Sequence, residues 1–517
     1  MPTALNTRLL AVWWQGTLLA IPWLNPYTAG PSPNTWPWLA SMFCGALLWL
    51  FRRHVSGRLV MAGWLAAALL SCAIALAQYF GLSPNFAPWI SQAQAGEAFA
   101  NLRQRNQFAG LTSIGLVALL ALAAGGATRP APARRACASA WACAAAAALL
   151  ALGNAASSSR TGGLQWMLIA LLAAWWSAPG GRQSLVLALQ ALAAYALAVL
   201  ALPALLEWAT GIQSSGLFGR LAEAPGCESR KILWSNVLRL IVQRPWFGWG
   251  WGELDYAHFV TLYPGPPEAR FCDILDNAHN LPLHLAVEFG VPMALAACAG
   301  AGWLLWRMRP WRETDCLRQG AWGVLAVIGL HSLLEYPLWY GPFQLAVALC
   351  VGLLWRAERA NIARQTDSHR KFKKKAVLAR YLRALSATVV IAGLGFAAVS
   401  YHSVSQIYLP LDERSAAYQV DTLDKVRGNR LFRQAARFAE LGVTPLTPQN
   451  AGAVHAMAEA LLHYSPEPLV IEKLIESAVM LGRDHEALGY LARYRAAFPQ
   501  EHARWAEANA NRQGLPG

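Results

Sequence analysis

Charge is the scarcest property of this 517-residue chain: 14% of its residues are Asp, Glu, Lys or Arg, whereas 56% are hydrophobic. A soluble protein of this length could not cover so much apolar surface with so few charges. The nine cysteines form no CxxC or Cys/His pattern, which argues against a cysteine-based metal site. These shortages predict an all-α, polytopic membrane protein.

The basic residues also lack the distribution expected of a nucleic-acid-binding protein. The net charge is +15, but Lys and Arg cluster between apolar runs, as in the cytoplasmic loops of membrane proteins. The first apolar run has no clean small-x-small cleavage site, and more apolar runs follow it. We therefore expect it to be retained as a helix rather than removed as a signal peptide.

Apolar runs that approach the roughly 17–25 residues needed to cross a bilayer recur along the chain. The eleven predicted spans are about 9–25, 36–51, 59–80, 107–126, 137–153, 162–178, 183–207, 282–306, 320–338, 340–356 and 384–402. With the N-terminus inside, the predicted cytoplasmic segments, including the one with RKFKKK, carry 22 Lys and Arg, against nine in the longer outer loops. Because this bias sets orientation, the loops 81–106, 154–161 and 208–281 and the turn at 336–341 are predicted to share the outer side.

The predicted organisation has four parts: N-terminal spans (1–207), an outer loop (208–281), C-terminal spans (282–402) and an outer helical domain (403–517). Within the loop, apolar residues at helical spacing over 229–243 predict an amphipathic helix at the membrane interface. Cys227 and Cys272 are the cysteines that we place outside, where they could form a disulfide or remain free. In the tail, LGRDHEALGYLARYRAAFPQ is typical of a tetratricopeptide-like helical hairpin.

Four polar clusters fall on the predicted outer side. They are 101–107, 157–162, the stretch around His279, and 331–340. Arginine suits pyrophosphate because its planar guanidinium donates two bonds to one anion and stays charged. Several arginines beside amides and a histidine at a membrane boundary suit a lipid-linked pyrophosphate that carries sugar. A histidine such as His279 can take a proton from an attacking hydroxyl, although Asp or Glu could do the same.

These residues also have structural interpretations. Arg103 and Arg105 could anchor the chain at lipid headgroups. His331 and Glu335, which their i,i+4 spacing places on one helix face, could form an interhelical pair. The same spacing relates His284 to Glu288 inside the predicted span 282–306, where a structural role is favoured. Asp273, Asp276 and His279 match no standard metal-site spacing, so we expect no metal and no other cofactor.

Five motifs carry a resemblance to a known family. They are QRNQFAG, SSSRTG, W-x(10)-P-x-x-G-x-G from Trp234 to Gly250, NAHN followed by Glu288-Phe-Gly290, and HSLLEYPLWY. In this order and on one side of the membrane, they resemble the bacterial O-antigen ligase/polymerase superfamily over roughly residues 95–355. EYPLWY and the helical tail make the chain most similar to protein O-oligosaccharyltransferases of the PglL type.

The resemblance implies that an oligosaccharide on undecaprenyl pyrophosphate is moved as a block to Ser or Thr hydroxyls of periplasmic proteins such as pilins, at the periplasmic face of the bacterial inner membrane. It also implies an essential histidine, a phosphate-binding arginine, a functional tyrosine and a functional glutamine. The glutamine could be Gln104 or Gln107, and we favour Gln104. The predicted catalytic residues are His279, Arg160, Tyr336 and Gln104, with His279 either activating the acceptor hydroxyl or stabilising the departing pyrophosphate. The predicted substrate-binding residues are Arg103, Arg105, Asn106, Gln107, Arg220, Asn280, His331 and Glu335.

Other functions share parts of this pattern. A lipopolysaccharide O-antigen ligase would use the same donor with a lipid A–core acceptor, and an O-antigen polymerase would use a second lipid-linked glycan. A transporter or flippase would be expected to have charges through the bilayer midplane and inverted repeats. Neither is evident in the sequence, so a glycosyl-transferring enzyme is favoured.

Overall fold

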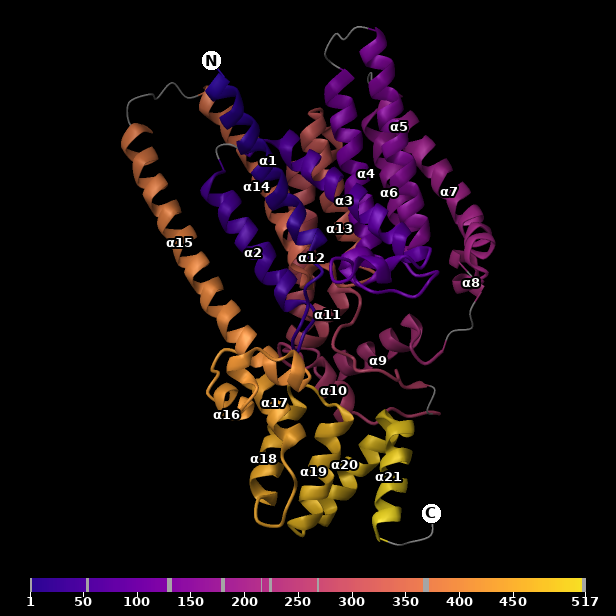
Figure 1. Ribbon diagram of the computed structural model, residues 1–517, viewed down its shortest axis with the longest axis vertical. Coiled ribbons are helices and arrows are strands. Elements are labelled where there is room, and N and C mark those ends of the chain that lie inside the picture. Colours follow the sequence, from indigo (N-terminus) through magenta and orange to yellow (C-terminus); the bar gives the residue numbers. More distant parts are fainter. Residues whose placement is uncertain are drawn as a thin grey trace. The chain divides into compact units, whose positions relative to one another are not determined.

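The computed structural model describes residues 2–52, 55–127, 133–177, 182–214, 216–222, 226–266, 269–365 and 372–513, and every regular element in these ranges is a helix (Figure 1). The chain divides into two units. The bundle unit contains Met1–Thr28, Ser32–Glu223 and Leu305–Phe396, and the loop–tail unit contains Ala29–Pro31, Ala224–Leu304 and Ala397–Gly517. Part of the predicted cytoplasmic RKFKKK run, with all of its side chains, lies outside the described residues.

The predicted spans of the bundle unit each overlap a helix, although the span 320–338 extends beyond the end of its helix at Ser332. The helices are α1 (Pro2–Leu24), α2 (Thr35–Leu50), α3 (Gly57–Tyr79), α4 (Arg105–Ala127), α5 (Ala133–Ala156), α6 (Arg160–Trp176), α7 (Arg182–Thr210), α13 (Cys316–Ser332), α14 (Gly341–Gln365) and the first part of α15 (Phe372–Ser405), with a short α8 (Gly216–Ala222) after α7. Across the described residues, six helices are long and apolar enough to cross a membrane: α3, α4, α5, α7, α12 (Val291–Met308) and α15. The total of eleven spans stays a prediction.

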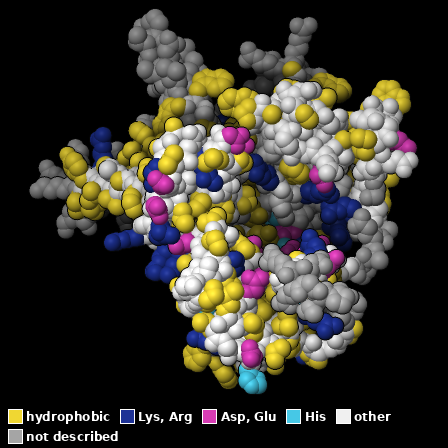
Figure 2. All heavy atoms as spheres, turned by 60° about the horizontal axis from the view of Figure 1, so that its bottom comes forward, with side chains coloured by type: hydrophobic (Ala, Val, Ile, Leu, Met, Phe, Trp, Pro, Cys, Tyr) yellow, Lys and Arg dark blue, Asp and Glu magenta, His cyan; other side chains and the backbone are white. Residues whose placement is uncertain are grey.

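Apolar side chains also cover much of the outside. Leu197 and Trp208 on α7 are exposed, as are Trp303 and Trp306 on α12. Figure 2 shows hydrophobic side chains spread among the charged ones over one face of the molecule. Together with the long apolar helices, this exposure fits a multi-pass membrane protein, in which lipid covers apolar side chains that water would not.

Helix α4 occupies the centre of the bundle unit. It packs against α3, α5, α6, α7 and α13, and most of its side chains are buried. Small residues allow this crowding: a Cβ added at Gly115 would lie 2.5 Å from Ala68 Cβ, and one at Gly323 would lie 2.9 Å from Val117 Cγ1. The loop with the predicted site residues therefore leads directly into the most buried helix of the bundle.

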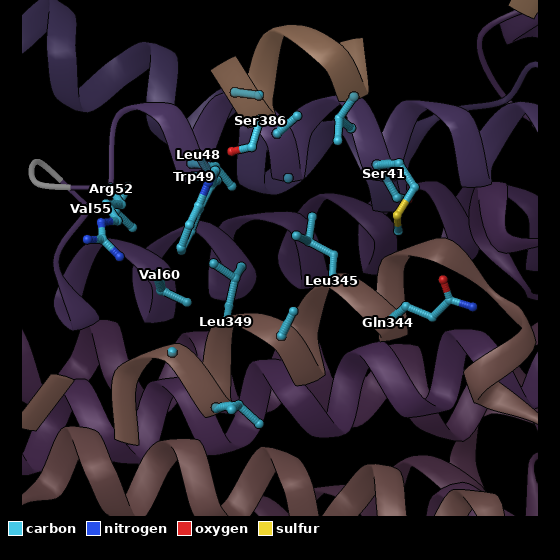
Figure 3. Close-up of a pocket in the computed structure, with 18 of the residues that line it drawn as sticks. Ser41, Leu48, Trp49, Arg52, Val55, Val60, Gln344, Leu345, Leu349 and Ser386 are labelled. Carbon is cyan, nitrogen blue, oxygen red and sulfur yellow. The ribbon is translucent and has the colours of Figure 1, made fainter. Parts of the chain in front are cut away.

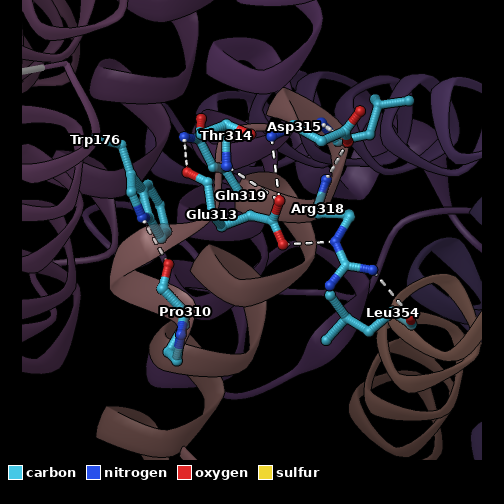
Figure 4. Close-up of polar contacts among 9 residues, drawn as sticks. Trp176, Pro310, Glu313, Thr314, Asp315, Arg318, Gln319 and Leu354 are labelled. Atoms are coloured by element: carbon cyan, nitrogen blue, oxygen red, sulfur yellow. Dashed lines mark hydrogen bonds and ion pairs between the residues drawn. The ribbon is translucent and has the colours of Figure 1, made fainter. Parts of the chain in front are cut away.

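A polar network fixes the opposite end of the bundle (Figure 4). Trp176 Nε1 at the end of α6 donates to Pro310 O at 3.0 Å. Arg318 on α13 donates from Nε to Glu313 Oε2 at 2.5 Å and from Nη1 to Leu354 O at 3.1 Å. These contacts tie α6, α13 and α14 together.

The loop–tail unit is built from shorter helices. They are α9 (Arg230–Gln243), α10 (Leu254–Val260), α11 (Leu281–Phe289), most of α12, the end of α15, α16 (Thr422–Arg427), α17 (Arg433–Val443), α18 (Ala451–Leu462), α19 (Pro468–Met480), α20 (Asp484–Ala497) and α21 (Pro499–Gln513). Successive helices from α16 to α21 pack against one another, as in helical hairpins. Their core also includes Phe259 of α10. The tetratricopeptide-like assignment of the tail remains a prediction.

The amphipathic helix expected over 229–243 is present as α9. Its apolar residues, however, are largely buried within the protein: Leu233, Val237, Leu240 and Ile241 share a core with α10 and α11. The apolar stripe that suggested a membrane surface is therefore mainly occupied by protein contacts.

The predicted span 282–306 is interrupted. Helix α11 ends at Phe289, Gly290 adopts φ 90°, and α12 begins at Val291. A Cβ at Gly290 would lie 2.2 Å from Trp246 O, so glycine permits the close approach of another loop. The apolar helix of spanning length begins only at Val291. His284 and Glu288 consequently lie on a separate short helix rather than inside one continuous span, which corrects the sequence-based expectation.

Candidate functional site

Side chains join the first turns of α4 and α6. Ser159 is the N-cap of α6: its Oγ accepts from Gly162 N at 3.0 Å and donates to Asn106 Oδ1 at 2.6 Å. Asn106 is the second residue of α4, and its Nδ2 donates to Glu335 Oε1 at 2.5 Å. Glycine at position 162 allows the helices to approach closely, because a Cβ there would lie 2.4 Å from Asn154 Oδ1 and 2.8 Å from Ala109 Cβ. Two helix N-termini are thus held side by side.

An arginine begins each of these helices. Arg105 is the first residue of α4 and is ion-paired with Glu97, whereas Arg160 is the first residue of α6 and its side chain is exposed. A helix N-terminus carries partial positive charge, so a cation there is unfavourable unless an anion is nearby. Backbone N–H groups at two N-termini, together with guanidinium donors, form an arrangement suited to a phosphate group.

Other predicted residues of the preceding loop have structural contacts. Arg103 adopts φ 59° and donates from Nη2 to Pro26 O at 3.1 Å, so it supports the loop. Gln104 Oε1 accepts from Gln107 N at 2.7 Å and thereby caps α4, which leaves the Gln104 amide NH2 as its donor for a substrate. Gln107 itself is buried.

The sequence alone did not identify a buried polar cluster beneath this site. Gln165 Oε1 accepts from Ser113 Oγ at 2.8 Å inside the bundle. Gln107 Oε1 and both amide atoms of Asn154 are buried, and within the described residues they have no hydrogen-bond partner in the protein. Polar atoms in such a position are usually satisfied by water. Glu97 was also missed, and Ser159 was part of a predicted cluster without its capping role, because ion pairs and inter-helix hydrogen bonds depend on tertiary contacts.

The 331–340 cluster differs from the prediction. His331 and Glu335 were expected on one helix face, but α13 ends at Ser332, so they do not share one. Pro337 disfavours the helical conformation only at Tyr336, the residue before it, and α13 ends four residues earlier. Glu335 N donates to His331 O at 2.8 Å, and the buried Glu335 carboxylate accepts from Asn106. Tyr336 stacks on Tyr340, with ring centroids 5.8 Å apart.

An apolar groove of about 1370 Å³ lies between α2, α14 and α15 (Figure 3). Ser41 and Gln344 line one end, and Trp49, Arg52 and Val55 line the other. The Gln344 end is one helical turn from Tyr340, because Gln344 N donates to Tyr340 O at 3.2 Å. Between the two ends, the groove is lined mainly by leucine, valine, alanine and glycine residues.

In the loop–tail unit, His279 occupies a constrained position directly before α11. It adopts φ 49°, and its N–H donates to Asn277 Oδ1 at 2.8 Å. Asn280 caps α11, its Oδ1 accepting from Leu283 N at 3.1 Å. Of the two alternatives that the sequence left open for Cys227 and Cys272, the disulfide is present, and it closes the loop that contains α9.

Helix α11 carries the second histidine. His284 Nε2 lies 3.4 Å from Glu288 Oε1, and both side chains are buried. Burial, with a smaller contribution from His279, lowers the pKa of His284 to about 4, and burial raises the pKa of Glu288 to about 6 although the Gly252 N–H opposes this. At neutral pH His284 is therefore uncharged and Glu288 is mainly ionised. This supports the structural interpretation of the pair.

Arg220 lies on α8, which packs against α7. Its predicted contact with the pyrophosphate, and the roles predicted for the other site residues, remain predictions.

Three family profiles match the chain. The family described as "Protein glycosylation ligase" matches residues 98–123, "O-Antigen ligase" matches 145–298, and "Virulence factor membrane-bound polymerase, C-terminal" matches 319–513. The curated "General O-oligosaccharyltransferase" of Acinetobacter baylyi (strain ATCC 33305 / BD413 / ADP1) is 28% identical over 144 residues. The resemblance is confirmed: the chain is similar to PglL-type O-oligosaccharyltransferases within the O-antigen ligase superfamily.

The matched segment covers 28% of this chain and spans 24% of that relative's length. The comparisons therefore support a glycosyl-transferring enzyme, and its activity and substrates are taken up below as proposals. The predicted site residues all fall within the three matched ranges of the O-antigen ligase superfamily: Arg103 to Gln107 in the first, Arg160, Arg220, His279 and Asn280 in the second, and His331, Glu335 and Tyr336 in the third.

Proposed function

We propose that this protein is an O-linked oligosaccharyltransferase that moves a preassembled glycan from undecaprenyl pyrophosphate to Ser or Thr hydroxyls of periplasmic proteins such as pilins. The acceptor hydroxyl attacks the anomeric carbon of the first sugar and gives up its proton. The bond between that carbon and the pyrophosphate oxygen breaks, and undecaprenyl pyrophosphate leaves. The proposed site is on the periplasmic side of the bacterial inner membrane.

The paired N-termini of α4 and α6 are the observation that carries this proposal. In the reaction, Arg160 and the backbone N–H groups of the two first turns bind the pyrophosphate, assisted by Arg105. Their positive charge stabilises the leaving group as its own charge grows. Gln104 and Tyr336 orient the sugar or the diphosphate, and Arg220 is a further candidate for binding it.

The proposed base is His279. A neutral imidazole can accept a proton through its unprotonated ring nitrogen, so in the proposed reaction His279 takes the proton of the acceptor hydroxyl. The left-handed backbone of His279 supports this assignment, because strained backbone of this kind clusters at functional sites. No metal or other cofactor enters the proposed reaction, since the arginines and N–H groups provide the charge stabilisation.

The polyprenyl tail of the donor is proposed to lie in the groove between α2, α14 and α15. We expect Gly352→Phe, which occupies part of the groove, to raise the donor KM about 10-fold, which corresponds to a loss of about 1.4 kcal/mol of binding free energy. A Cβ at Gly352 would meet no atom within 4 Å, so the fold should tolerate the change. Gly300→Phe on α12, where the added atom also has open space, is the control. An unchanged donor KM in Gly352→Phe would show that the groove holds only bilayer lipid.

The proposal is tested by co-expressing the full chain with a lipid-linked glycan pathway and a periplasmic acceptor protein. A mass increase equal to the whole glycan on a Ser or Thr peptide is the expected result. Loss of lipopolysaccharide O-antigen on deletion, with unmodified acceptor throughout, would instead identify a lipopolysaccharide ligase. That rival is kept because the O-antigen ligase profile covers 145–298.

A further inference from the structure

The segment that leads to His279 depends on α9 for its backbone contacts. Residues 270–280 form no helix, so their backbone polar groups need partners from elsewhere. Asn236 of α9, which is buried, donates from Nδ2 to Ala269 O at 3.0 Å and accepts from Phe271 N at 2.9 Å. Trp234, one half-turn earlier, donates from Nε1 to Ala278 O at 3.1 Å. Side chains of α9 thus provide hydrogen-bond partners for the backbone of this segment, as a neighbouring strand would in a sheet.

The Ala278 peptide groups are held from two sides. Trp234 Nε1 donates to the Ala278 carbonyl, and the Ala278 N–H donates to His284 Nδ1 at 3.4 Å. The next residue is His279, whose φ of 49° costs of order 1–3 kcal/mol and persists only where the surroundings hold it. Because the Ala278 carbonyl carbon is bonded to the nitrogen of His279, a shift of the Ala278 carbonyl moves the backbone that carries the His279 side chain.

Helix α9 is itself fixed at both ends. The disulfide ties Cys227, three residues before α9, to Cys272. After α9, the segment PWFGWGWGE binds the end of α11 and the start of α12 through four hydrogen bonds of 2.8–3.0 Å. Trp249 N donates to Val287 O, Gly250 N to Glu288 O and Gly252 N to Glu288 Oε1. In the other direction, Val291 N donates to Pro245 O. A Cβ at Gly248 would lie 2.3 Å from the Glu288 backbone, so glycine allows this contact.

We propose that the motif from Trp234 to Gly250 is a structural support that sets the orientation of His279. Within it, Trp234 is a positioning residue that acts through the Ala278 carbonyl. This inference rests on the proposed function, in which His279 is the base. In this role the residues of the motif affect the reaction through His279 and need not touch the substrate.

The test is Trp234→Phe in the full-length protein, which keeps an aromatic ring and removes the N–H donor. We expect kcat for glycan transfer to fall about 10- to 100-fold with donor and acceptor KM nearly unchanged, because a small displacement of a reacting group is costly. Hydrogen exchange over 272–281 should become faster while the disulfide stays formed. Trp176→Phe is a matched control, because it removes an equivalent indole bond to a backbone carbonyl at the far end of α6 (Figure 4) and should leave kcat unchanged.

A second pair of variants tests the other side of the same peptide. His284→Asn keeps an acceptor for the Ala278 N–H and should retain most of kcat, whereas His284→Leu should lose it. Wild-type kcat in both Trp234→Phe and His284→Leu would overturn the positioning role while leaving the proposed function intact. An unmodified acceptor with the wild-type enzyme would instead reject the proposed function.

Discussion

Replacing His279 is expected to abolish glycan transfer. In the proposed reaction it removes the proton from the acceptor hydroxyl, and loss of a general base lowers rates by about 10²–10⁴-fold. His279→Asn is the sharpest variant, because asparagine tolerates the left-handed backbone that position 279 requires (φ 49°) and cannot act as the base. The measurement is the fraction of acceptor peptide that carries the whole glycan, determined by mass spectrometry.

Two further variants serve as comparisons for His279→Asn. His279→Ala should match His279→Asn, whereas His485→Ala on the exposed face of α20 should transfer at the wild-type rate. The disulfide between Cys227 and Cys272 should remain in every variant, which shows that the loop has folded. Undiminished transfer by His279→Asn would remove His279 from the mechanism.

Replacing Arg160 by alanine should affect activity and stability in opposite directions. Transfer should fall about 10²–10³-fold, as when an enzyme loses one electrostatic stabiliser of its transition state. Stability should be unchanged or rise by about 0.3–1 kcal/mol, because the exposed cation at the start of α6 opposes the helix dipole. Transfer assays and thermal unfolding in detergent measure the two effects.

Arg182→Ala is the matched control for Arg160→Ala. Arg182 is likewise an exposed arginine that begins a helix, α7, but it is predicted to lie on the cytoplasmic side. Its removal should have a similar effect on stability and none on transfer. Equal losses of transfer in both variants would mean that Arg160 acts through general charge rather than by binding the pyrophosphate.

The sequence predicted the helices of the bundle well, because long apolar runs at helical length leave few alternatives. It also predicted that polar clusters far apart in sequence would share a site. Within the bundle unit, the structure joins three of them through Asn106, Ser159 and Glu335. The fourth cluster, around His279, belongs to the loop–tail unit, and its role beside the others stays part of the proposed mechanism.

Individual polar contacts were less predictable. The i,i+4 spacing of His331 and Glu335 suggested one helix face, but α13 ends at Ser332, and the Glu335 carboxylate accepts from Asn106. Arg103, a candidate substrate ligand, donates to Pro26 O, a partner 77 residues away. Spacing along one helix is local information, whereas these partners come from other helices and loops.

Composition, apolar run length and basic-residue bias by themselves indicated a helical membrane protein, because so few charged residues cannot shield that much apolar surface from water in a soluble protein. The motifs determined which superfamily it resembles. Only the tertiary structure decided how the residues act: that α9 buries its apolar stripe in protein, that Gly290 separates α11 from α12, and that Trp234 holds the peptide before His279. Those outcomes depend on close approaches and hydrogen bonds between distant segments, which no periodicity along the chain encodes.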